Sequence, residues 1–132
     1  MIATIQRTVI FEAAHRLPHV CDGHKCGRMH GHSYRVTVRA RGVVQTTGDE
    51  AGMVVDFARI DAVLRPLDHT TLNDHPRLAN PTSEVLAGWV IARLRAGGVP
   101  VLDVAVAETD RSEATVRACD VPEDAYPARG AP

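Results

Sequence analysis

The twelve residues from His30 to Arg41 read His-Gly-His-Ser-Tyr-Arg-Val-Thr-Val-Arg-Ala-Arg. From Tyr34 onward, apolar residues occupy every second position and polar residues fill the positions between them. Because successive side chains of a strand point to opposite faces, this alternation predicts a half-buried strand from about His32 to Val44. The apolar face consists of Tyr34, Val36, Val38 and Ala40, and the polar face carries Ser33, Arg35, Thr37, Arg39 and Arg41.

Before and after this strand, the sequence predicts three more strands and two helices. The strands are expected at Thr4–Ala14, Val101–Thr109 and about Glu113–Cys119. One helix is expected from an Asp56 cap to Leu64, and the other from Asn80-Pro81-Thr82-Ser83, with Pro in the first turn, to about Ala96, before Gly97-Gly98. The order β-β-α-α-β-β predicts an α+β fold in which two helices cover one face of a four-stranded antiparallel sheet. We expect a single domain over residues 1–119 and a flexible C-terminal tail over residues 120–132.

Composition excludes several classes of protein. The 132 residues carry a net charge of -1, 45% hydrophobic residues and 4% aromatic residues. A nucleic-acid-binding domain that used Arg35, Arg39 and Arg41 would need a basic field and aromatic faces for base stacking, so we expect no nucleic-acid partner and instead a solvated face or a contact with a neighbouring subunit. No apolar run approaches the roughly 20 residues that span a bilayer, and no leader sequence is evident, so a cytoplasmic location is expected.

Histidines are concentrated in one segment, since five of the seven fall between His15 and His32. His30 and His32 point to the same face of the predicted strand, and His15 has the parity of the apolar face of the preceding strand. If the two strands form a hairpin, the three imidazoles meet at one end, and three histidines with an open position are typical of catalytic zinc. His19 and His24 are rival ligands. The alternatives are a hairpin with incidental histidines and a non-catalytic zinc module.

The three cysteines are Cys21, Cys26 and Cys119, and an odd number argues against a disulfide framework. Cys26 lies four residues before His30. A nearby metal and the positive charges of Lys25 and Arg28 favour the thiolate, which is the reactive form of cysteine. An unreactive loop cysteine is the alternative.

Two acidic positions are candidate site residues. Asp68-His69 pairs a carboxylate with an imidazole, an arrangement that suits proton transfer. An ordinary surface turn is the alternative. Glu108 follows Leu102, Val104 and Val106 on the predicted inner face of its strand. A carboxylate there needs a partner, and a heterocycle with two N–H donors would suit it, whereas a strand end turned to solvent is the alternative.

Together these segments resemble the 6-pyruvoyl-tetrahydropterin synthase family, and within it the bacterial 6-carboxy-tetrahydropterin synthases. The matching stretches are Phe11-Glu12-Ala13-Ala14-His15-Arg16-Leu17-Pro18, Gly23-His24-Lys25-Cys26-Gly27-Arg28-Met29-His30-Gly31-His32, Val55-Asp56-Phe57, Leu67-Asp68-His69, Leu72-Asn73-Asp74, Asn80-Pro81-Thr82-Ser83-Glu84 and Glu108-Thr109. They follow the family order over most of the chain, and Cys-x-x-x-His-Gly-His is the form associated with the 6-carboxy subfamily.

The resemblance implies a role for each candidate. The zinc ligands would be His15, His30 and His32, the catalytic groups Cys26, Asp68 and His69, and the pterin anchor Glu108. The implied reaction converts 7,8-dihydroneopterin triphosphate to 6-carboxy-5,6,7,8-tetrahydropterin, acetaldehyde and triphosphate, in queuosine or deazapurine biosynthesis. The implied structure is the tunnelling fold, assembled as a homohexamer of two trimers with active sites between subunits. A 6-pyruvoyl-tetrahydropterin synthase activity on the same substrate is the alternative within the family.

Overall fold

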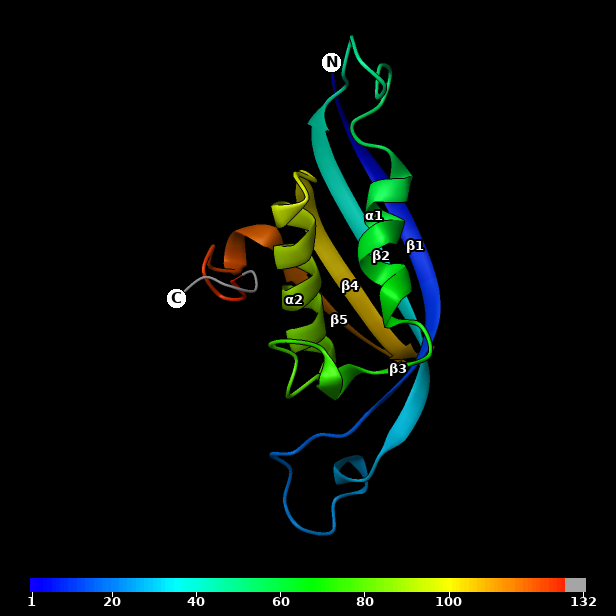
Figure 1. Cartoon of the computed structure of the whole chain (residues 1–132), viewed down its shortest axis with the longest axis vertical. Coiled ribbons are helices and arrows are strands. Elements are labelled where there is room, and N and C mark those ends of the chain that lie inside the picture. The colour runs from blue at the N-terminus through cyan, green and yellow to red at the C-terminus, as the bar shows by residue number, and fades with distance from the viewer. Residues whose placement is uncertain (128–132) are drawn as a thin grey trace.

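The computed structural model describes residues 1–127, which form one sheet with two helices on one face (Figure 1). The strands are β1 (Ile2–His15), β2 (His30–Val43), β3 (Thr70–Thr71), β4 (Val101–Thr109) and β5 (Ser112–Arg117), and the helices are α1 (Phe57–Leu64) and α2 (Ser83–Ala96). The strand order is β3-β1-β2-β4-β5, and only β3 runs parallel to its neighbour. The α+β class is therefore confirmed, but the sheet has five strands rather than four. A two-residue strand is too short to produce an alternating pattern in sequence.

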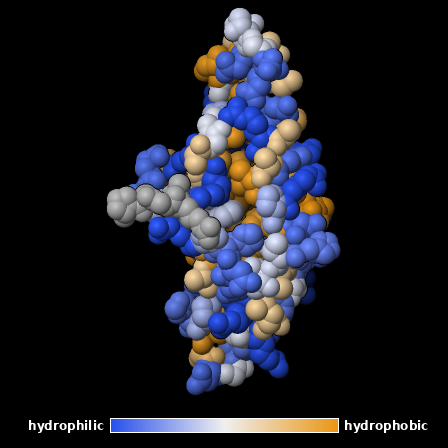
Figure 2. All heavy atoms as spheres, in the orientation of Figure 1, coloured by the Kyte–Doolittle hydropathy of each residue, from blue (hydrophilic) through white to orange (hydrophobic). Residues whose placement is uncertain are grey.

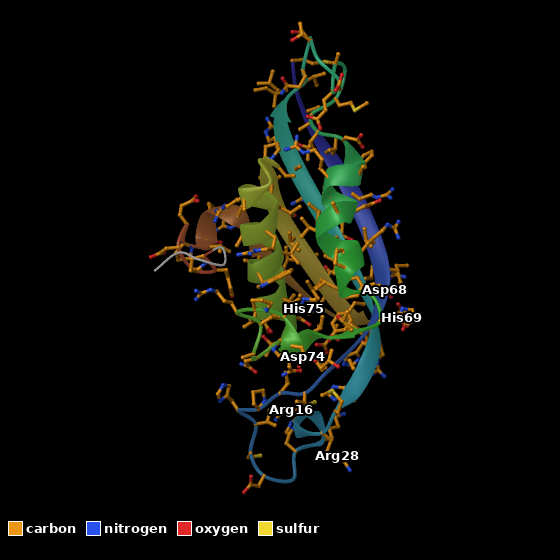
Figure 3. The ribbon with its side chains drawn as sticks, in the orientation of Figure 1. Arg16, Arg28, Asp68, His69, Asp74 and His75 are labelled. Atoms are coloured by element: carbon orange, nitrogen blue, oxygen red, sulfur yellow. The ribbon has the colours of Figure 1, made fainter. Side chains whose placement is uncertain are left out.

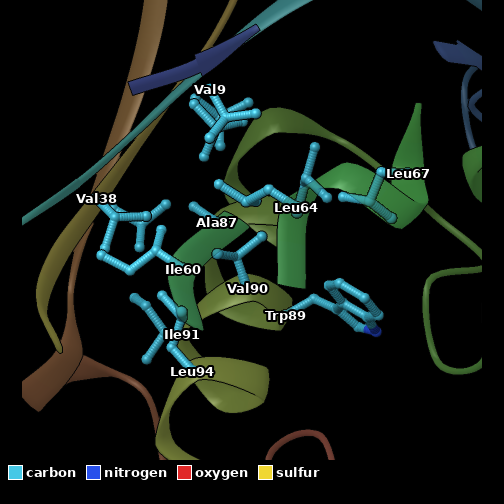
Figure 4. Packing of buried hydrophobic residues seen from close by; sticks show 14 of the residues in the cluster. Val9, Val38, Ile60, Leu64, Leu67, Ala87, Trp89, Val90, Ile91 and Leu94 are labelled. Carbon is cyan, nitrogen blue, oxygen red and sulfur yellow. The ribbon is translucent and has the colours of Figure 1, made fainter. Parts of the chain in front are cut away.

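The core lies between the sheet and the helices. Alternate residues of β1 and β2, from Val9 to Ala13 and from Tyr34 to Ala40, are buried, as their parity predicts. They pack against Ile60 and Leu64 of α1 and against α2, and Figure 4 shows Val9 and Val38 facing this cluster. An apolar strip is visible between the two helices on an otherwise mainly polar face (Figure 2). Burial of each such side chain stabilises the fold by about 1.5–3 kcal/mol.

Helix α1 begins at its predicted cap, Asp56, whereas α2 is capped by Thr82, the residue after the proline that was expected in its first turn. The Asp56 carboxylate accepts from the Ala58 N–H at 2.8 Å, and the Thr82 hydroxyl accepts from the Val85 N–H at 3.2 Å. Pro81 therefore precedes the cap of α2 instead of lying in its first turn. This difference matters for the site, because it leaves the Pro81 carbonyl outside the helix and available as an acceptor.

The inner face of β4 differs from the prediction at one position. Arg39 of β2 pairs with Asp103, but the next residue, Ala40, pairs with Val101, so Leu102 is an extra residue at a β-bulge. Leu102 is 37% exposed, whereas Val104 and Val106 are buried as expected. A bulge depends on the partner strand and is not visible in the alternation of β4 alone.

The last strand and the segment after it also differ in detail. β5 ends at Arg117, and Cys119 lies in the 3-10 turn Ala118–Asp120 rather than in the strand. The Arg95 guanidinium on α2 donates to the Val121 carbonyl at 2.8 Å. Of the tail expected over 120–132, residues 128–132 lie outside the described residues.

The outward arginines of β2 contact side chains of the same chain. Arg39 binds Asp103 through two hydrogen bonds, Arg35 lies 3.5 Å from Asp110, and Arg41 donates to the Thr4 hydroxyl. Two of the three positive charges are thus paired with carboxylates, which weakens the case for a phosphate-binding surface. Neither helix in the described part of the chain is long and apolar enough to cross a bilayer.

Candidate metal centre and active site

The β1–β2 hairpin brings three histidines together at one end of the sheet. His15 pairs directly with His30, and His32 lies two residues farther along the same face of β2. Their ligand nitrogens all lie within 4.8 Å of one another, and His15 is only 1% exposed. The period of two that predicts the strands therefore also assembles a set of three imidazoles.

Backbone carbonyls orient two of these rings. His15 Nδ1 donates to the Pro81 carbonyl at 2.8 Å, and His30 Nδ1 donates to the Arg28 carbonyl at 2.7 Å. Since a carbonyl only accepts, each Nδ1 must carry a proton, and in the neutral ring the lone pair then lies on Nε2. A hydrogen bond from the other ring nitrogen to a carbonyl is the usual way in which proteins orient a metal-binding histidine.

The free nitrogens fit a divalent cation. The Nε2 atoms of His15 and His30 lie 3.0 Å apart, and within residues 1–127 the buried His32 Nε2 has no hydrogen-bond partner. Burial lowers the pKa of His32, although the charge of Glu108 opposes this effect, so the neutral ring is favoured. Two facing lone pairs and a buried ring nitrogen that can supply a third are together the donor set of a three-histidine metal centre.

A cleft of about 680 Å³ opens onto this centre and holds two further candidates. The half-buried Cys26 lines it from the 3-10 turn Lys25–Gly27, where the His24 side chain accepts from the Cys26 N–H at 3.1 Å. The rival His24 thus caps the turn instead of joining the metal group.

Glu108 enters the same cleft from β4. Its carboxylate oxygens lie 3.6 Å from His32 Nε2 and 3.9 Å from His15 Nε2. The side chain is not turned fully to solvent, since a quarter of it is exposed. The predicted anchor therefore stands beside the histidines, where it can accept hydrogen bonds from a bound heterocycle.

Asp68 and His69 form a pair but not in this cleft. His69 Nδ1 lies 2.9 Å from an Asp68 oxygen, and Asp68 also accepts from the Glu12 N–H at 2.9 Å. The Glu12 N–H and the His69 ring hold the pKa of Asp68 below its usual range. His69 has φ of 58° and its side chain is 80% exposed. The pair lies at the edge of the sheet near the end of α1 (Figure 3). His69 lines another cleft of about 500 Å³ with Glu12 and Ser33, and this lining shares only His32 with the cleft of Cys26.

The comparison with known proteins agrees with this geometry. Residues 4–119 match the family described as 6-pyruvoyl tetrahydropterin synthase. A protein of Synechocystis sp. named 6-carboxy-5,6,7,8-tetrahydropterin synthase is 49% identical over 117 residues, which are 83% of this chain and 89% of that protein. A protein of Pyrococcus furiosus named dihydroneopterin monophosphate aldolase is 30% identical over 91 residues, which are 66% of this chain and 74% of that protein.

A solved structure extends the agreement to the fold. The 6-pyruvoyl tetrahydropterin synthase of Caenorhabditis elegans superimposes with a TM-score of 0.71 at 28% identity, over 89% of this chain and 96% of that one. The sequence match runs from residue 4 to residue 119 and therefore includes every candidate residue described above. The chain therefore belongs to the 6-pyruvoyl tetrahydropterin synthase family.

Proposed function

We propose that the chain is a zinc-dependent lyase that converts 7,8-dihydroneopterin triphosphate and water to 6-carboxy-5,6,7,8-tetrahydropterin, acetaldehyde and triphosphate. The observation that carries the proposal is one cleft that holds three metal-binding histidines, the Cys26 thiol and the Glu108 carboxylate. The name of the Synechocystis relative supports the choice of product. We extend the proposal to a cytoplasmic enzyme that acts in the biosynthesis of queuosine or a related deazapurine.

The metal and Glu108 bind different parts of the substrate. Zinc bound by His15, His30 and His32 would supply Lewis-acid chemistry at the hydroxyl-bearing side chain of the substrate. Glu108 accepts two hydrogen bonds from the N–H edge of the pterin ring, which orients the ring beside the histidines. The position of Glu108, 3.6 Å from His32 Nε2, supports this division because it puts the ring next to the metal-binding atoms.

Proton transfer is carried out by the Cys26 thiol and the His69 imidazole. Cys26 accepts and returns a proton at the side-chain carbons of the substrate, because it lines the cleft that contains the histidines. His69 is the second acid–base group. Asp68, which its depressed pKa keeps ionised at neutral pH, fixes the His69 ring through the 2.9 Å contact.

We propose further that the complete site requires a second subunit. Cys26 and His69 line different clefts of one chain, and His69 is largely exposed. In a homohexamer built from two trimers, the Asp68–His69 pair of one subunit would face the Cys26 cleft of another. Closed symmetric assembly of this kind is common among soluble homo-oligomers.

Product identification tests the function. Metal-loaded protein is incubated with 7,8-dihydroneopterin triphosphate, and the products are identified by mass spectrometry, with Cys26→Ala as the control. We expect 6-carboxy-5,6,7,8-tetrahydropterin together with acetaldehyde. A product that keeps the three-carbon side chain would instead assign a 6-pyruvoyl-tetrahydropterin synthase, and an unchanged substrate would overturn the proposal.

A further inference from the structure

The loop between β1 and β2 carries three cationic side chains that have no acidic partner. Within the described residues, no carboxylate oxygen lies within the 4.0 Å ion-pair distance of Arg16, Lys25 or Arg28. Seven other arginines, at positions 7, 35, 39, 59, 65, 95 and 117, do form ion pairs. The loop therefore carries three positive charges that are left available to a ligand.

These cations line two clefts that adjoin each other. Lys25 and Arg28 line the cleft of the histidines, and Arg16 and Arg28 line a second cleft of about 410 Å³. Leu17 and Arg28 belong to both linings, and the Leu17 N–H donates to the Cys26 carbonyl at 2.8 Å. Figure 3 shows Arg16 and Arg28 on this loop beyond the end of the sheet. Arg28 thus stands where the catalytic cleft continues into the second one.

The backbone under both arginines is held in place. The Arg28 carbonyl accepts from His30 Nδ1 at 2.7 Å, so the metal centre itself anchors this residue. The Arg16 N–H donates to the Asn73 side chain at 3.0 Å, and the Arg16 carbonyl accepts from the same side chain at 2.8 Å. Anchored backbones with uncommitted guanidinium groups are organised for an anion before it arrives.

The charges around these clefts favour a chain of phosphates over a single one. The opposing carboxylates are Asp22 in the second cleft and Glu108, whose oxygens lie against the histidines at the other end of the first. The cations are spread along the path between the clefts. A guanidinium group binds phosphate oxygens in a bidentate manner, and two separated arginines can each bind a different phosphate of one chain.

We propose that Arg28, together with Arg16 and Lys25, binds the triphosphate chain of the substrate, which runs from the catalytic cleft into the second cleft. This inference rests on the proposed function for the identity of the ligand. It implies a preference for a triphosphate ester over a monophosphate ester. The preference would separate this chain from the Pyrococcus furiosus relative, whose name specifies a monophosphate.

Inorganic triphosphate is the probe that tests the subsite. Its affinity for the metal-loaded protein is measured by titration calorimetry and compared with that of inorganic phosphate. We expect Arg28→Gln and Arg16→Gln each to weaken triphosphate binding by about 10-fold or more, the usual loss for a hydrogen bond to a charged group. The matched control is Arg41→Gln, which removes the same charge at the far end of the hairpin. Metal content is measured before and after, because triphosphate also binds divalent cations.

The outcomes separate this inference from the proposed function. If both loop variants bind triphosphate as the unmodified protein does, or if Arg41→Gln loses as much affinity, the subsite is wrong. Arginine-dependent triphosphate binding in a protein that does not turn over the pterin would keep the subsite and overturn the function. Turnover with an unchanged KM in Arg28→Gln would overturn the subsite and keep the function.

Discussion

The Nε2 atoms of His15 and His30 lie 3.0 Å apart, while the Nδ1 of each ring donates to a backbone carbonyl. In two neutral rings held this way, the facing nitrogens are both acceptors, so the contact repels unless a cation lies against both. On the same face, His32 Nε2 has no hydrogen-bond partner among residues 1–127, and the lowered pKa of His32 favours a neutral ring that can supply a third ligand nitrogen. A divalent metal ion bound between the three rings would remove this repulsion.

The first prediction concerns metal content. Purified protein should carry about one divalent ion per chain, the stoichiometry of a three-histidine site. His15→Ala and His30→Ala should lose the ion, as measured by plasma mass spectrometry. The matched control is His19→Ala, which removes an exposed imidazole outside the histidine group and should keep the ion. Full metal retention in both His15→Ala and His30→Ala would overturn the assignment of the metal ligands.

The second prediction separates the thiol from the metal. Cys26→Ala should fold, keep its metal and lose turnover, because Cys26 lines the cleft without belonging to the histidine group. Cys21→Ala, on the exposed part of the same loop, should stay active. The rate of product formation and the metal content are measured on the same samples. An active Cys26→Ala beside an inactive Cys21→Ala would mean that the wrong thiol has been chosen.

The fold is predictable wherever one face of an element is buried. The alternation of β2 and the Asp56 cap of α1 are local signals, and the structure follows them. The exposed Leu102 could not be predicted, because the bulge that expels it exists only in the pairing of Arg39 and Ala40 with β4. Strand β3 is set by its contact with β1 and leaves no pattern of its own.

The same distinction applies to the site. The three histidines can be placed from parity, because a period of two and a hairpin fix which side chains meet. The carbonyls of Pro81 and Arg28 that orient them carry no side-chain signal in the sequence. Asp68 and His69 are adjacent in sequence, yet neither lines the cleft of Cys26, and His69 lines another one. We propose that they meet across subunits, and a relation between subunits leaves no local pattern in a single sequence.

The third prediction concerns the pterin anchor. Glu108→Gln keeps the shape of the side chain but turns one acceptor into a donor that faces a donor. The free energy of product binding should become less favourable by about 1.5–3 kcal/mol, which raises Kd roughly 10- to 150-fold. Metal content should not change, since Glu108 lies outside the histidine group. Binding is measured by titration calorimetry, and an unaltered Kd would show that the ring binds elsewhere.

The fourth prediction concerns a buried hydroxyl behind the metal centre. Tyr34 is fully buried, its ring stacks on Phe11 with centroids 5.4 Å apart, and among residues 1–127 its hydroxyl has no hydrogen-bond partner. Burial raises the pKa of Tyr34, so the hydroxyl stays protonated. Tyr34→Phe removes an unsatisfied polar group and keeps the stacking. The free energy of unfolding should rise by about 1 kcal/mol.

Chemical denaturation of the metal-loaded protein measures this change, with metal content as the control. A decrease of the free energy of unfolding in Tyr34→Phe would mean that the hydroxyl makes a hydrogen bond, for example to a buried water molecule.

The last prediction tests whether the catalytic groups come from two subunits. Cys26→Ala and His69→Ala should each be inactive. If Cys26 of one chain works with His69 of another, oligomers assembled from equal amounts of both variants contain some complete sites. Random assembly gives a site an intact Cys26 half of the time and an intact His69 half of the time, so activity should recover to about a quarter of that of the unmodified protein. The double variant Cys26→Ala/His69→Ala mixed with the unmodified protein gives the same fraction of complete sites and is the matched control. If both groups of a site came from one chain, the first mixture would stay inactive while the control mixture kept about half of the activity, and the shared site would be excluded.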